Sequence, residues 1–158
     1  MINKEKILEE LELAFSKFRK EFAFNVNFEE LDKEFFIKDS VLSTGFISPE
    51  FSRQVCSRIV ESYRDWHGYL NNLLLPNPSY YAGQTESKLF SSEEDKRKIW
   101  NLVELSMKFS SAHSLNMLKS NKELISKFID EGYLTWVNTF KPRLIYILDK
   151  VNEGWKKE

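Results

Sequence analysis

The sequence predicts an all-α fold, a bundle of five to six helices with two long central antiparallel helices. Over most of the chain, apolar residues recur at intervals of three and four, which places them on one face of a helix. Only five glycines and four prolines occur in 158 residues, which is few for a turn-rich β fold. Hydrophobic residues make up 42% of the chain and aromatic residues 15%, so a packed core is expected. At this length we expect a single helical-bundle domain over residues 1–158.

The first half of the chain contains three predicted helices. An asparagine cap and a regular apolar spacing predict a helix over 3–22, and a capping box predicts a short helix over 27–37. Residues 38–47 have no clear period and are interpreted as a connector. The serine, proline and glutamate at 48–50 form a strong start signal for a long helix that ends near Leu75.

The segment over 76–90 contains prolines and a glycine, and we expect it to be the longest irregular stretch of the chain. Loops of this length in a compact domain are often functional, and tyrosine is favoured at interfaces. The candidate interface residues of this loop are Tyr80, Tyr81, Gln84 and Lys88. The alternative is that the two tyrosines only cover the end of the bundle.

A second long helix is predicted over 93–119, opened by a capping box of Ser91 and Glu94. Its apolar residues span a very wide arc, so we expect this helix to contact several neighbours and to lie at the centre of the bundle. The residues of this arc are Ile99, Trp100, Leu102, Val103, Leu105, Met107, Phe109, Met117 and Leu118.

Three polar residues, Ser106, Ser110 and His113, fall in the middle of that apolar arc. In one interpretation the serines allow close helix packing and bond to their own helix, while a neutral His113 is satisfied by one partner. In the other, the three residues line a small polar ligand pocket between helices, which His67 of the other long helix completes. Nothing in the sequence fixes the register that would bring the two histidines together.

The last part of the chain is also predicted to be helical. A capping box of Ser120 and Glu123 opens a helix over 120–132, and Gly132 is expected to end it. Helical spacing resumes over 133–155, where Pro142 is expected to kink or break the helix.

Composition argues against several classes of function. The formal net charge of −1 does not favour nucleic-acid binding, since such proteins normally carry a basic surplus. The chain has two histidines and one cysteine, and it lacks a phosphate-binding loop and zinc-ligand spacing. We therefore predict no catalytic residues, no metal and no cofactor. Cys56 has no partner for an internal disulfide and is interpreted as a small buried hydrophobe.

The expected location is cytoplasmic, because the first residues lack the apolar core of a signal peptide and no apolar run approaches the length of a membrane span. The leading functional hypothesis is a non-enzymatic protein-protein interaction module that binds a protein partner or a second copy of itself as a dimer. The surplus of aromatic residues favours this hypothesis. The alternative is a small enzyme or ligand-binding protein with a polar pocket around His113.

Overall fold

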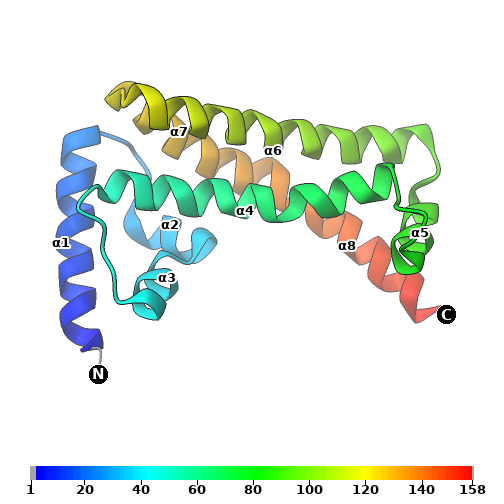
Figure 1. The fold of residues 1–158 in the computed structure, drawn as a ribbon, viewed down its shortest axis with the longest axis horizontal. Helices are drawn as coiled ribbons and strands as arrows, with labels where there is room; N and C mark the ends of the chain where they lie inside the picture. Colours follow the sequence, from blue (N-terminus) through cyan, green and yellow to red (C-terminus); the bar gives the residue numbers. More distant parts are fainter. Residues whose placement is uncertain (1–2, 158) are drawn as a thin grey trace.

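The computed structural model describes residues 3–157, and most of them are helical (Figure 1). In chain order the elements are α1 (Lys4–Phe22), α2 (Phe28–Phe35), α3 (Ile37–Thr44), α4 (Phe51–Leu74), α5 (Tyr81–Ser87), the 3-10 helix η1 (Lys88–Phe90), α6 (Glu93–Lys119), α7 (Lys122–Thr135), the π-helical segment η2 (Trp136–Phe140) and α8 (Lys141–Lys156). Along these residues, no helix combines the length and the apolar character that crossing a membrane requires.

The two long helices, α4 and α6, run antiparallel and pack against each other along their length (Figure 1). At the middle of this contact the ring of Tyr63 stacks on that of Phe109, with the ring centroids 4.6 Å apart. The Tyr63 hydroxyl also donates a hydrogen bond of 2.6 Å to the carbonyl of Gly132 in α7. The predicted all-α bundle with two long antiparallel helices is therefore confirmed.

Of the two long helices, α4 takes the more central place, because it packs against α1, α2, α5, α6 and α7. The wide buried arc predicted for α6 is wrong: Trp100 and Met107 are each 51% exposed and Leu118 is 86% exposed. The reason is that α6 packs against α4, α7 and α8, while the face that carries Trp100, Met107 and Leu118 is covered by no helix of the described chain. Its buried face is a stripe at three-and-four spacing that includes polar residues, namely Ile99, Leu102, Val103, Ser106, Phe109, His113 and Asn116.

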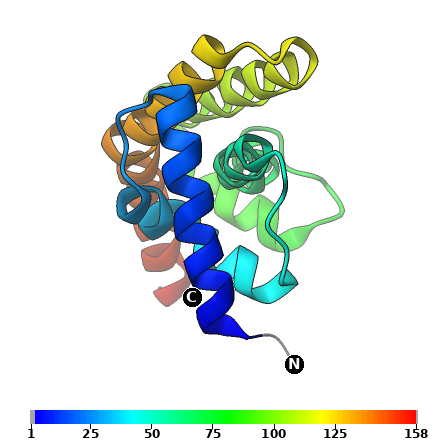
Figure 2. The same ribbon diagram turned by 90° about the vertical axis from the view of Figure 1, so that its left-hand side faces the viewer.

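The N-terminal helix α1 crosses the end of the α4–α6 pair at a steep angle (Figures 1 and 2). Phenylalanine side chains fill this junction, where the rings of Phe15 and Phe18 both meet Phe51 at the start of α4 edge to face. The neighbouring α2 is tied to the C-terminal helices by Glu34, whose carboxylate accepts hydrogen bonds from Lys141 Nζ at 2.8 Å and Trp136 Nε1 at 3.1 Å.

Two segments predicted to be irregular contain short helices. The expected connector over 38–47 is mostly α3, which follows α2 through Phe36 in the left-handed conformation with φ of 54°. This reversal breaks the apolar period, so no helical pattern extends across the junction. The expected loop over 76–90 holds α5 and η1, which are too short to show a period. Gly83 of α5 lies so close to α4 that a Cβ on it would be 2.5 Å from Asn72 Nδ2.

Several predicted helix ends shift by a few residues. The cap of α6 is Ser92 rather than Ser91, and that of α7 is Asn121 rather than Ser120. The long helix α4 begins at Phe51, where no side chain caps it. Gly132 does not end α7, because the chain stays helical through η2 into α8. Pro142 is the second residue of α8, and the turn before it widens into the π-helical segment instead of breaking.

Candidate functional site

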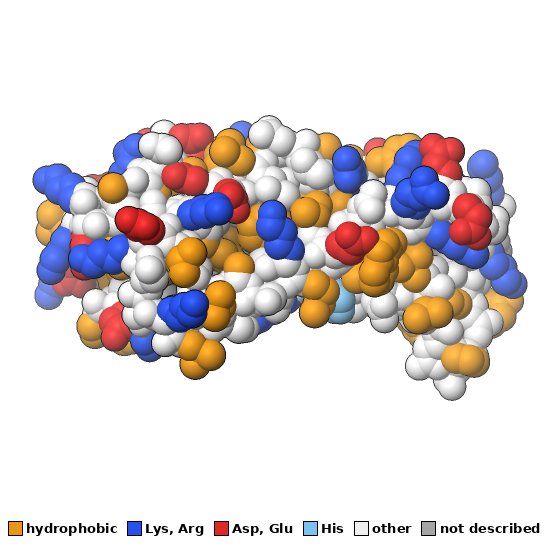
Figure 3. Space-filling view, turned by 90° about the horizontal axis from the view of Figure 1, so that it is seen from above, with side chains coloured by type: hydrophobic (Ala, Val, Ile, Leu, Met, Phe, Trp, Pro, Cys, Tyr) orange, Lys and Arg blue, Asp and Glu red, His pale blue; other side chains and the backbone are white. Residues whose placement is uncertain are grey.

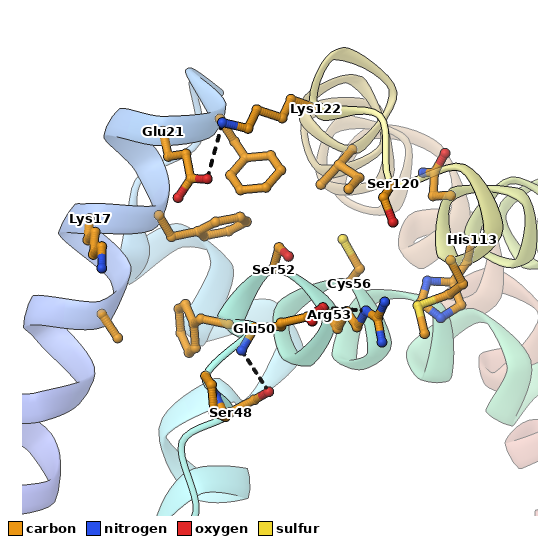
Figure 4. Close-up of a pocket in the computed structure, with 18 residues that line it drawn as sticks. Lys17, Glu21, Ser48, Glu50, Ser52, Arg53, Cys56, His113, Ser120 and Lys122 are labelled. Carbon is orange, nitrogen blue, oxygen red and sulfur yellow. Dashed lines mark hydrogen bonds and ion pairs between the residues drawn. The ribbon is translucent and has the colours of Figure 1, made fainter.

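A cavity of about 440 Å³ lies where α1 crosses the start of α4, the end of α6 and the start of α7 (Figure 4). Its wall is mixed, with phenylalanine side chains from α1 and α4 on one part and polar side chains from α4, α6 and α7 on the other. Figure 4 shows Cys56 and His113 projecting toward this cavity from α4 and α6, with Ser120 above them. Residues far apart in the sequence therefore form one site.

Local hydrogen bonds position the elements around this cavity. Ser120 adopts a left-handed conformation with φ of 52°, and its N–H bonds to the Asn116 carbonyl at 2.9 Å, which ends α6. The Asn121 side chain then accepts from the first N–H groups of α7. On the opposite wall, the Gln54 side chain accepts from Ser48 N–H at 2.8 Å and donates to the Phe46 carbonyl at 3.0 Å. These bonds hold the segment before α4 against the helix that it precedes.

His113 is the buried polar residue of the cavity wall. Its side chain is 8% exposed, and its ring lies 5.9 Å from that of Phe128, centroid to centroid. Its Nδ1 atom is buried and has no hydrogen-bond partner within residues 3–157. Burial lowers the pKa of His113 from its usual value of 6.5, and the positive charge of Arg64 lowers it further, whereas Glu61 opposes the shift. The imidazole is therefore neutral at pH 7.

Cys56 faces the same cavity but does not provide a nucleophile. The residue is 4% exposed, and burial raises the pKa of its thiol to about 12. The thiolate is the reactive form of cysteine, so a thiol held protonated at neutral pH is inert. Burial thus disfavours the reactive form of Cys56 at neutral pH.

Charged side chains stand around the opening of the cavity. Lys122 forms an ion pair of 3.2 Å with Glu21, and Arg53 forms one of 2.7 Å with Glu50. Lys17 is the third cation of the wall, so its cations exceed its carboxylates by one. The N-terminus of α4 adds the positive end of a long helix dipole, since no side chain caps it.

The other three predicted pocket residues lie elsewhere, along the contact between α4 and α6. His67 Nδ1 is 2.9 Å from Ser106 Oγ, and Ser106 donates its own proton to the Val103 carbonyl at 2.7 Å. Nδ1 of His67 is therefore the donor in this pair. One turn away, Arg64 Nε donates to Ser110 Oγ at 2.9 Å.

In both pairs the serine hydroxyl bonds to a side chain of α4 across the helix contact, and Ser106 also bonds to a carbonyl of its own helix. Ser106 precedes His113 by two helical turns, so the register pairs His67 with Ser106 and keeps the two histidines apart.

The predicted interface residues lie at the opposite end of the molecule from the cavity, around α5 (Figure 1). Tyr80 is 58% exposed and Tyr81 is 84% exposed. Lys88 is exposed as well, while Gln84 is half-buried and donates from Nε2 to the Asn77 carbonyl at 3.4 Å.

Sequence reasoning missed most residues of the cavity wall, including Lys17, Arg53, Ser120 and Lys122. Each of them is an ordinary polar residue at a helix end or on a helix surface, and only the crossing of α1 over the other helices brings them together. The helix-start signal at 48–50 identified residues of one wall, but it could not predict which helices form the other walls.

The fold and the site define an all-α bundle with a cavity of mixed polarity at the junction of four helices. Within residues 3–157, no group of three or more His, Cys, Asp and Glu side chains is arranged to hold a metal ion. Comparison of the chain with protein-family models, curated proteins and solved structures finds no match.

Proposed function

We propose that the protein binds a small organic ligand in the cavity beside His113. The observation that carries this proposal is a cavity of about 440 Å³ whose mixed wall includes His113, a neutral imidazole with no hydrogen-bond partner at Nδ1 within residues 3–157. Ligand pockets typically enclose about 300 to 1,000 Å³ and combine an apolar lining with a few polar groups.

Binding without catalysis is the better-supported form of this proposal. The buried thiol of Cys56 stays protonated, and no hydrogen bond joins His113 to a serine within the described residues. A nucleophile and a base within hydrogen-bond reach are the usual signature of covalent catalysis, and this wall lacks such a pair.

Native mass spectrometry of the purified full chain, followed by a thermal-shift screen of chemically diverse small molecules, tests the proposal. We expect a retained small molecule or a reproducible stabilising compound. The effect should be lost in His113→Leu and retained in the matched control His67→Leu, which lies outside the cavity. If neither method finds a ligand, or if both variants respond alike, the proposal fails.

A second candidate function, self-association as an interaction module, is favoured by the outer face of α6. Trp100, Met107 and Leu118 are exposed on this face. Trp100 and Leu118 lie the same number of residues before and after Phe109. A second copy packed antiparallel about a two-fold axis at Phe109 would place each Trp100 against the partner's Leu118, a self-complementary contact. Hydrophobic side chains appear in separate patches on this side (Figure 3), so the contact would be narrow, and we rank this function second.

Light scattering of the full chain across a concentration series tests self-association. We expect Trp100→Ser with Leu118→Ser to shift the protein toward monomer, and the matched pair Tyr80→Ser with Tyr81→Ser to leave its mass unchanged. The opposite result would move the interface to the α5 end. A wild-type chain that is monomeric at every concentration would remove this candidate.

A further inference from the structure

We infer that the cavity selects a small amphipathic carboxylate, whose anionic group binds Arg53 and His113 and whose apolar body packs against the phenylalanine side chains of α1 and α4. This inference rests on the proposed ligand-binding function and adds the chemical class of the ligand. Three properties of the wall lead to it: its charge, the donors that it leaves free and the nature of its apolar part.

The charge of the wall favours a single negative charge on the ligand. Lys17, Arg53 and Lys122 face only two carboxylates, those of Glu21 and Glu50. One positive charge is thus left over, and the uncapped N-terminus of α4 adds to it. A dianion such as inorganic phosphate carries more negative charge than this single surplus positive charge balances, and it has no apolar part to contact the phenylalanine side chains.

Arg53 has free donors suited to a carboxylate. Its Nε atom bonds to Glu50 at 2.7 Å, while its two terminal nitrogens make no hydrogen bond within residues 3–157. Guanidinium groups bind carboxylates through parallel N–H donors, so Arg53 can keep Glu50 and accept a second carboxylate. In Figure 4 the Arg53 side chain extends along α4 on the side of the cavity where His113 lies.

His113 supplies a further donor from the opposite helix. Because its imidazole is neutral, one ring nitrogen carries a proton, and since Nδ1 is enclosed by the protein, the ring nitrogen that a ligand can reach is Nε2. A carboxylate oxygen in the cavity accepts from the Nε2–H group of this tautomer. Arg53 on α4 and His113 on α6 thus offer donors from two sides of the same cavity.

The rest of the wall is suited to an aromatic ring or a short aliphatic chain. Phe18 and Phe51 are almost fully buried beneath it, and Phe22 and Ile125 are partly buried beside them. An apolar ligand body that covers these side chains is removed from water, which favours binding in proportion to the buried area.

Isothermal titration calorimetry of the full chain with matched acids and amides tests the inference. The probes are 3-phenylpropanoate, indole-3-acetate and octanoate, each beside its neutral primary amide, with inorganic phosphate as a further probe. We expect at least one acid to bind at least tenfold tighter than its amide, and phosphate to bind more weakly than that acid.

Arg53→Gln should weaken binding of that acid at least tenfold and change amide binding little. The matched control Arg97→Gln, an exposed arginine near the start of α6 and therefore at the other end of the molecule from the cavity, should bind as the wild type does. Circular dichroism checks that both variants are folded, which the exposure of Arg53 leads us to expect.

Four outcomes overturn the inference: an amide that binds as tightly as its acid, phosphate that binds as tightly as the best acid, an unchanged Arg53→Gln variant, or no binding of any acid. Equal binding of acid and amide leaves the proposed ligand-binding function standing with a neutral ligand. If no acid or amide binds while the diverse screen still finds a ligand that depends on His113, only the chemical class proposed here is wrong.

Discussion

His113 carries a pH dependence whose sign follows from its surroundings. Burial and the charge of Arg64 lower its pKa in the folded protein below the usual 6.5, against the smaller opposite effect of Glu61. The unfolded chain therefore takes up a proton at a higher pH than the folded one does. The free energy of unfolding that depends on neutral His113 is fully present above pH 6.5 and decreases as the pH falls from there toward the folded-state pKa.

We predict that His113→Gln reduces the loss of stability between pH 7.5 and pH 5, because the variant has no proton to take up at this position. Urea denaturation of wild type and variant at several pH values measures this difference. Asp95 does not interfere, because its hydrogen bond with Lys150 lowers its pKa below 3.8, outside this window. Parallel stability curves for the two proteins would show that His113 is solvated in the folded state.

The reactivity of Cys56 measures how well the cavity wall shields this side chain from water. Burial keeps its thiol protonated, with a pKa of about 12, and leaves it 4% exposed. We predict that iodoacetamide at pH 8 alkylates the native protein at least a hundredfold more slowly than the urea-unfolded chain, because the thiolate is the reactive species. The chain has one cysteine, so the mass of the intact protein reports this site alone. Similar rates in both states would place the thiol in water.

At the scale of helices, the sequence predicted those features that depend on contacts between neighbouring residues, such as helix caps. The caps at Asn3 and Asn27 are confirmed, because each lies within three residues of the N–H group that it accepts from. The bounds of α6 were predicted correctly, but its capping residue was misplaced by one position, since Ser91 and Ser92 are each followed three residues later by an acidic side chain. The short helix α3 was missed because tertiary packing, not length or period, stabilises a segment of this size.

Two glycines within helices allow a prediction that separates helix propensity from packing. Gly68 lies on the exposed side of α4, and a Cβ added to it meets no atom within 4 Å. Gly132 of α7 faces α4, where a Cβ would lie 3.0 Å from Ile59 Cγ2. We predict that Gly68→Ala raises the free energy of unfolding by about 0.5 to 1 kcal/mol, through the helix propensity of alanine.

The same change at Gly132 should give no gain or a net loss, because Ile59 must move to admit the methyl group. Chemical denaturation measures both variants, and adding Ile59→Leu, which removes the Cγ2 methyl, should cost less stability in the Gly132→Ala background than in the wild type. A Gly132→Ala variant as stabilised as Gly68→Ala would mean that α4 and α7 separate without cost.

At the scale of the whole molecule, the sequence patterns predicted the fold class but not the cavity. The three-and-four spacing that predicts a helix describes one face of one element, whereas the cavity depends on how α1 crosses the ends of α4 and α6 (Figures 1 and 2). Of the cavity residues, only His113 was singled out beforehand as a pocket residue, since a histidine on an apolar face is conspicuous by itself. Arg53 and Ser120 gave no comparable signal.

The attachment of α1 to the rest of the molecule rests in part on one carboxylate. Asp130 of α7 accepts hydrogen bonds from the N–H groups of Asn25 at 3.0 Å and Val26 at 3.1 Å, in the turn between α1 and α2. Arg19 of α1 holds the same turn through the Asn25 carbonyl at 2.8 Å. Since α1 forms one wall of the cavity, this turn connects the stability of α1 to the integrity of the binding site.

We predict that Asp130→Ala loosens α1 while the α4–α6 pair stays folded, because the lost bonds anchor the turn and not the long helices. Hydrogen exchange followed by mass spectrometry should show faster exchange in peptides from α1 and unchanged exchange in the centre of α4 and α6. Ligand affinity at the cavity should fall in parallel, as one wall becomes mobile. Asp149→Ala, the same change in α8 on the far side of the molecule, is the control and should leave α1 protected. If exchange rises equally in all helices of Asp130→Ala, α1 unfolds only together with the whole bundle, and the cavity wall has no independent motion.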